Sequence, residues 1–164
     1  MPEKKTIEKA RKDKSEGKSA STQAGEFVHQ EIEHIKEGKH GARSTKQAIA
    51  IGLSEARRAG VKVAAPKNAS KATKTKAEHD SAAGAKGAKK TVSRTRSKAT
   101  SDALKKEGHA AASTASLSKQ AKSAAAKRTA ADRSASARKA AKTKGPEERS
   151  AAARKAARTR EKST

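Results

Sequence analysis

Apolar residues recur at helical spacing in the first part of the chain. Five residues share one face of a predicted helix over 23–37: Ala24, Val28, Glu31, Ile32 and Ile35. Phe27 lies at the edge of this face, and the opposite face is acidic. Ser21 and Thr22 are suitable helix-start residues, and Gly38 is a typical stop. The pattern predicts an amphipathic helix with a narrow apolar side.

A second helix is predicted over 45–59. Ser44 followed by Gln47 matches a capping box, and Gly60 ends the pattern. The apolar stripe consists of Ile49, Gly52, Leu53, Ala56 and Ala59. Because Gly52 lies on this stripe, it would let two helix backbones approach closely. The two stretches therefore predict a helical hairpin.

A third, charged helix over about 3–15 offers only Ile7 and Ala10 as apolar contacts. The sequence thus predicts an all-α fold in which residues 1–63 form a small helical hairpin, or a unit of three helices. A core of this size is marginally stable alone. We expect the unit to be weakly stable or to be stabilised by self-association.

The apolar pattern ends near Val63. Residues 64–164 contain Val92, Leu104 and Leu117 as their only large apolar residues, with 27 Lys or Arg against 8 Asp or Glu. Such a composition buries too little apolar surface to offset the entropy of folding. It predicts a basic flexible linker over 64–95 and a long, largely disordered or partly helical tail over 96–164.

The tail contains a repeat. Residues 133–144 recur as 149–160, with nine of twelve positions identical. In the second copy, Pro146 suits a first helical turn, Glu147 and Glu148 follow it, and basic residues fill the far end. Because alanine has the highest helix propensity, these copies can become helical when their charges are neutralised.

The net charge of +24 indicates a polyanionic partner, and nucleic acid is the abundant one in a cell. On a helix, Arg154, Lys155, Arg158 and Lys162 would form one basic stripe, which Arg138, Lys139 and Lys142 partly repeat. A solvated tail with no fixed helix is the alternative. The candidate phosphate contacts are Arg138, Lys139, Lys142, Arg149, Arg154, Lys155, Arg158 and Arg160.

A second candidate for anion binding is the turn between the two hairpin helices. Four basic residues gather around its glycines just before a helix N-terminus: Lys39, His40, Arg43 and Lys46. A plain polar turn is the competing interpretation. The connection over 38–43 is longer than the three or four residues usual in a helix-turn-helix, which argues against that motif.

Other chemistry is poorly represented in the sequence. There is no cysteine, and His29, His34 and His40 are five and six residues apart, which does not place two imidazoles on one helical face. We therefore expect surface histidines, no metal, no cofactor and no catalytic residues. The charged N-terminus and the lack of long apolar runs predict no secretory signal and no membrane insertion.

Residues 44–54, Ser-Thr-Lys-Gln-Ala-Ile-Ala-Ile-Gly-Leu-Ser, carry a resemblance. With the preceding Lys-Gly-rich turn, they resemble the core of a small uncharacterised bacterial family. Some similar proteins are labelled DNA-binding or plasmid stabilisation, which implies a nucleoid role. The Ala/Lys/Arg tail is similar in composition to bacterial linker-histone-like proteins, although it lacks their regular Lys-Pro-Ala-Ala units.

Together these features predict a non-enzymatic, histone-like protein of the cytoplasm and nucleoid that binds duplex DNA independently of sequence. One alternative is association with RNA or the ribosome, which the same charge would support. The scarcity of aromatics favours duplex phosphates over single strands. A second alternative is a disordered stress-protection protein, although such proteins usually balance lysine with glutamate.

Overall fold

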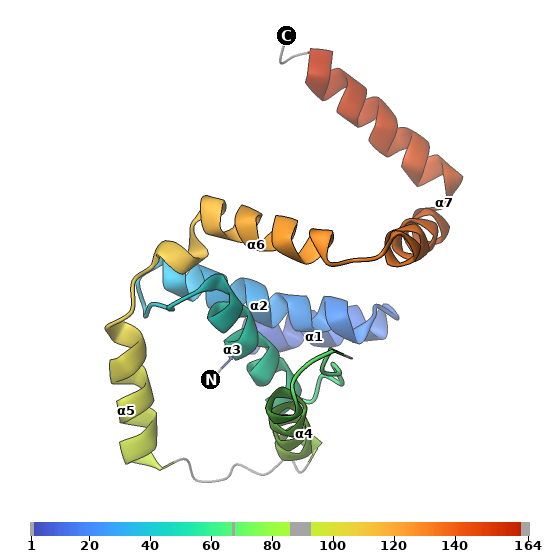
Figure 1. The fold of residues 1–164 in the computed structure, drawn as a ribbon. Coiled ribbons are helices and arrows are strands. Elements are labelled where there is room, and N and C mark those ends of the chain that lie inside the picture. Colours follow the sequence, from blue (N-terminus) through green and yellow to red (C-terminus); the bar gives the residue numbers. More distant parts are fainter. Residues whose placement is uncertain (1, 67, 86–92, 162–164) are drawn as a thin grey trace. The chain divides into compact units, whose positions relative to one another are not determined.

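The computed structural model describes residues 2–66, 68–85 and 93–161, and every regular element in these ranges is a helix (Figure 1). The chain divides into two compact units between Gln120 and Ala121. The helices are α1 (Lys4–Ser15), α2 (Ala20–Lys36), α3 (Thr45–Arg58), α4 (Lys71–Ala85), α5 (Arg94–Lys105), the short 3-10 helix η1 (Ala110–Ala112), α6 (Thr114–Ala126) and α7 (Ala130–Glu161). No helix in the described ranges is long and apolar enough to cross a membrane.

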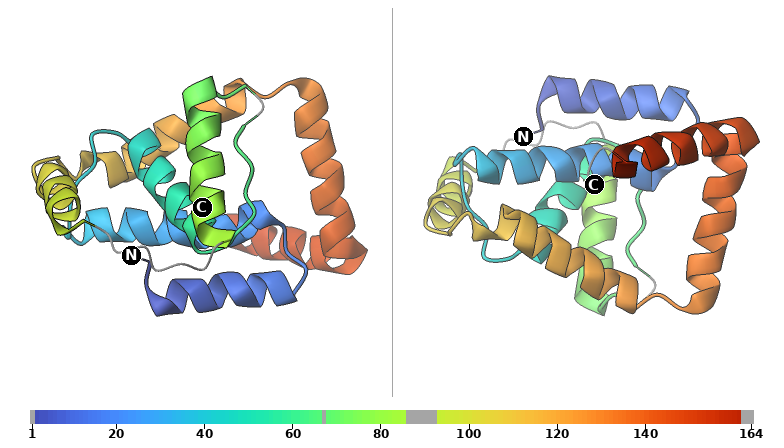
Figure 2. Two further views of the ribbon diagram at one scale, coloured as in Figure 1. Left: turned by 90° about the horizontal axis from the view of Figure 1, so that it is seen from below. Right: turned by 90° about the horizontal axis from the view of Figure 1, so that it is seen from above.

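The predicted hairpin is present as α2 and α3, and α1 packs on the other side of α2 (Figure 2). Phe27 on α2 is fully buried and shares a cluster with Ala10 of α1 and Ala56 of α3. Leu53 packs against the same cluster but is only partly buried. This cluster is therefore centred on one aromatic ring, and alanines make up most of its other buried members.

The helix ends mostly follow the predicted signals. The Ser44 hydroxyl accepts the Gln47 N–H at 3.3 Å, and the Gln47 side chain accepts the Arg43 N–H at 3.0 Å. Gly38 has a positive φ of 75°, which a residue with a side chain rarely adopts. The start of α2 differs from the prediction, because Ser19 rather than Ser21 is the cap and accepts the Thr22 N–H.

The close approach predicted at Gly52 is observed. A methyl group on Gly52 would lie 2.7 Å from the Cα atom of Val28, well inside van der Waals contact. The backbones of α2 and α3 therefore touch at this point, and no larger residue fits between them.

The interval 64–95, predicted as a flexible linker, contains α4, which packs on α3. Asp80 is 2% exposed and anchors this contact. It accepts hydrogen bonds from Ser54 at 2.6 Å and Lys76 at 2.6 Å, and Arg58 lies 3.4 Å away. Burial raises the pKa of Asp80, but the bonds from Lys76 and Ser54 and the charge of Arg58 outweigh it, so that its pKa lies below the ordinary value.

A later segment also joins the N-terminal unit. Ala111 and Ala112 of η1 are buried in a second cluster with Ile35 and Ala48. The Thr45 hydroxyl donates to the carbonyl of Ala111 at 2.6 Å. Residues more than sixty positions apart are thus joined through small side chains and backbone groups.

The predicted disordered tail is wrong, because α5, α6 and α7 are helical over most of 94–161. Side-chain hydrogen bonds cap the N-termini of these helices: Ser93 caps α5 and Ser113 caps α6, and Thr129 and Asp132 each accept the other's backbone N–H at the start of α7. Alanine, lysine and arginine have high helix propensity, and such caps stabilise the helix ends. The count of large apolar residues therefore underestimated helix formation in this part of the chain.

Replacing Gly52 with alanine should destabilise the N-terminal unit, because the added methyl forces α2 and α3 apart. Gly25→Ala is the matched control, since Gly25 is an exposed glycine of α2 with no atom near its missing Cβ. We expect Gly25→Ala to stabilise the protein by about 0.5–1 kcal/mol through helix propensity. Urea unfolding followed by circular dichroism measures both. If the free energy of unfolding changed in the same direction in both variants, the backbone contact between α2 and α3 at Gly52 would be contradicted.

Asp80→Asn should cost about 1.5–3 kcal/mol at neutral pH, because charged hydrogen bonds are lost from a buried site. Since the folded pKa is lowered, the ionised group stabilises the protein above about pH 3.9 and this contribution disappears as the pH falls through the folded pKa. The difference in the free energy of unfolding between the parent protein and the Asp80→Asn variant should therefore become smaller at low pH. Asp102→Asn, which removes an exposed pair with Lys98, should change stability by less than about 1 kcal/mol.

Candidate functional site

The repeat found in the sequence corresponds to two helical segments of α7. Gly145 interrupts the helix with φ 64° and ψ 171°, and Pro146 follows at the start of the second segment. The first copy, 133–144, lies before this kink and the second, 149–160, lies after it (Figure 1). Each copy thus lies within one helical segment, and Pro146 stands at the start of the second segment, as its position in the second copy had indicated.

All eight predicted phosphate contacts are exposed on α7: Arg138, Lys139, Lys142, Arg149, Arg154, Lys155, Arg158 and Arg160. Arg138 and Lys142 are four residues apart on the first segment, and Arg154 and Arg158 are four apart on the second. Side chains at this spacing lie on one helix face, about 6 Å apart along the axis. Lys162, the last member of the predicted stripe, lies outside the described residues.

Acidic groups on α7 leave most of this charge uncompensated. Asp132 is engaged at the start of the helix, where hydrogen bonds from Thr129 lower the pKa of its carboxyl. Between Ala130 and Glu161 the sequence has ten Lys or Arg against four Asp or Glu. The exposed surface of α7 is therefore strongly positive.

The predicted anion-binding turn has a different character. Lys39 lies 2.9 Å from Glu37 and 3.4 Å from Glu3, and its hydrogen bonds with these carboxylates raise its pKa. The Arg43 guanidinium lies 3.7 Å from Glu107. Three of the four predicted cations, including His40 described below, thus lie beside carboxylates.

The fourth basic residue of the predicted anion-binding turn, Lys46, is exposed on the first turn of α3. Two backbone N–H groups near this helix end already have acceptors. The Gln47 N–H donates to the Ser44 hydroxyl, and the Arg43 N–H donates to the Gln47 side chain. The turn is consequently much less suited to binding a phosphate than the sequence suggested.

The same turn brings together three residues that could hold a metal ion. Ligand atoms of Glu31, His34 and His40 all lie within 4.8 Å of one another. The histidine spacing did not predict this, because His40 lies beyond the helix end and returns toward α2 after Gly38. A sequence signal was present in the pair Glu31 and His34, which are three residues apart and therefore share a face of α2.

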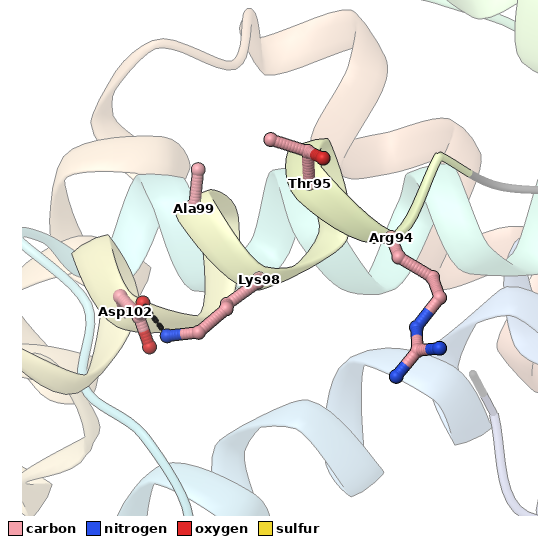
Figure 3. Close-up of a pocket in the computed structure, with 5 residues that line it drawn as sticks. All are labelled: Arg94, Thr95, Lys98, Ala99 and Asp102. Atoms are coloured by element: carbon pink, nitrogen blue, oxygen red, sulfur yellow. Dashed lines mark hydrogen bonds and ion pairs between the residues drawn. The ribbon is translucent and has the colours of Figure 1, made fainter.

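A shallow hollow of about 500 Å³ lies beside α5 (Figure 3). Its lining residues all belong to one helix: Arg94, Thr95, Lys98, Ala99 and Asp102. Lys98 donates to Asp102 at 2.9 Å, and the other side chains point outward without converging. One helix face of this kind offers no enclosed space for a substrate.

Comparison with known proteins gives one match. Residues 4–68 match the model of a family of unknown function, DUF6496. The match covers α1 to α3 and stops before α4 and the basic helices. No curated protein and no solved structure matches the chain. The class that the fold defines is thus a small all-helical unit followed by basic, alanine-rich helices.

Proposed function

We propose that the protein binds duplex DNA independently of sequence, through the exposed basic faces of α7. The observation that carries this proposal is the arrangement of the repeat, which presents two helical segments with the same pattern of Arg and Lys. Cations held on a helix contact phosphates at lower entropic cost than cations on a disordered chain. Neutralising several phosphates releases bound counterions, which supplies the affinity.

The small residues between the cations support the same proposal. Alanine occupies most of the remaining positions of both copies, including Ala140, Ala141, Ala156 and Ala157. Alanine side chains are short, so the helix can approach the sugar-phosphate backbone closely while Arg and Lys reach around it.

The choice of duplex DNA over single strands rests on the aromatic residues. Proteins that bind single strands usually stack bases on aromatic side chains. Phe27 is the only aromatic residue among Phe, Tyr and Trp, and it is fully buried. The chain has no exposed ring of this kind on which a base could stack. Such a protein would act on the nucleoid as a histone-like component, with the N-terminal unit positioning it or mediating self-association.

The affinity for duplex DNA should fall steeply with salt. If at least four phosphates are neutralised, log K against log salt should have a slope of about −3.6 or steeper. Fluorescence anisotropy with a labelled duplex of 20 base pairs measures this, and scrambled duplexes should bind within about tenfold of one another. Unlabelled RNA and single-stranded DNA serve as competitors. An affinity that ignores salt, or stronger competition by RNA than by duplex DNA, would contradict the proposal.

Replacing six cations of α7 by glutamine should lower the affinity more than replacing six others. The test variant changes Arg138, Lys139, Lys142, Arg154, Lys155 and Arg158. The matched control changes three Arg and three Lys that are exposed elsewhere: Arg11, Arg94, Arg96, Lys4, Lys14 and Lys74. Glutamine keeps helix propensity, so circular dichroism should be unchanged.

Both variants have the same net charge, so general electrostatic attraction falls equally. We expect at least a tenfold greater loss of affinity in the α7 variant and a shallower salt slope. Equal losses in the two variants would show that the charge acts diffusely and that α7 is not the binding surface.

A further inference from the structure

The turn after α2 places two imidazoles beside a buried carboxylate. Glu31 and His34 lie on the last turns of α2. The backbone N–H of Lys39 donates to the carbonyl of His34 at 3.0 Å, and Gly38 with its positive φ reverses the chain. His40 thereby returns to α2, where its ring meets that of His34 edge to face, with centroids 6.1 Å apart.

Glu31 is an unusual residue for a small helical unit. It is 3% exposed, and its Oε1 atom has no hydrogen-bond partner among the described residues. Its other oxygen, Oε2, lies 3.6 Å from Nε2 of His40. Buried polar atoms almost always have a partner, so a buried carboxylate oxygen without one is available to a ligand such as a cation.

His40 is already oriented as a ligand. Its Nδ1 lies 3.2 Å from the carbonyl oxygen of Gly41, which can only accept, so Nδ1 carries the hydrogen of this bond and Nε2 is the nitrogen that faces Glu31. This is the outer contact that fixes the ring of many metal-binding histidines. His34 is held by its neighbours as well, since its Nε2 lies 3.1 Å from Glu3 and 3.4 Å from the side chain of Gln30.

The surrounding backbone holds the turn in place. The N–H of Gly41 donates to the carbonyl of Leu104 at 2.9 Å, and that of Ala42 donates to Gly108 at 3.1 Å. A methyl group on Gly41 would overlap the carbonyl of Glu107. The loop that carries His40 is therefore fixed against a second segment of the unit.

We propose that Glu31, His34 and His40 bind a divalent transition-metal ion, with zinc as the ion that two imidazoles and one carboxylate suit best. Ligand atoms in a tetrahedral zinc site are about 3.4 Å apart, given bonds of about 2.1 Å. The ligand atoms of the three residues lie within 4.8 Å of one another, so binding an ion would draw them closer together. Three protein ligands leave a fourth position for water. The ion would tie the end of α2 to the loop that follows it.

The test uses the untagged full chain and zinc alone. Titration against a chromophoric zinc chelator near neutral pH should give one ion per chain, and cobalt should show the absorption of a tetrahedral site. Zinc should also raise the melting temperature. In NMR spectra, the imidazole nitrogens of His34 and His40 should shift on adding zinc, whereas those of His29 and His79 should not.

Two variants and a control locate the site. Glu31→Gln and His40→Ala should each lower zinc affinity at least tenfold and clearly reduce the shift in melting temperature. His29→Ala removes an exposed histidine of the same helix and should bind zinc as the parent does. Glu31→Gln keeps the side-chain shape, and circular dichroism verifies its fold.

Three results would overturn the proposal: no stoichiometric binding by the parent, equal loss in His29→Ala and His40→Ala, or NMR shifts spread over all histidines. The last two would indicate adventitious binding to surface imidazoles. The NMR measurement uses only the parent chain, so the outcome does not depend on the folding of any variant.

Discussion

The direct contact between the backbones of α2 and α3 is the constraint on which the N-terminal unit depends. Gly52 lets the two helices touch at Val28, and this short separation lets Phe27 fill the space between three helices. A larger residue at Gly52 would collide with the α2 backbone at Val28 and force the two helices apart. A unit with so few large side chains can exclude water only because its helices are unusually close.

The same use of small residues extends the unit beyond its three helices. α4 meets α3 where Gly84 faces the carbonyl of Arg57, and η1 meets α2 and α3 through Ala111 and Ala112. Polar groups then fix these contacts in place. The buried carboxylate of Asp80 is satisfied by three neighbours, and Thr45 bonds the backbone of Ala111.

The sequence predicted α2 and α3 to within a few residues, because their apolar stripes and the Ser44 cap are local signals. It also predicted the close approach at Gly52. It did not predict the packing of α4 and η1, because alanines and a single aspartate carry no periodic pattern that distinguishes a buried face from an exposed one. The grouping of Glu31 with His34 and His40 was missed for a related reason. It depends on the path of the chain after Gly38, which spacing along one helix does not describe.

The joint at Gly145 has a consequence for how the basic helices can vary. Each copy of the repeat contributes five positive charges, and the Gly-Pro-Glu-Glu between them removes two. Because Gly145 ends one helical segment and Pro146 starts the next, the basic face of an added copy need not continue the helical periodicity of its neighbour. The charge of this region can thus change in steps of one sixteen-residue unit during evolution, without any adjustment in the packed part of the chain.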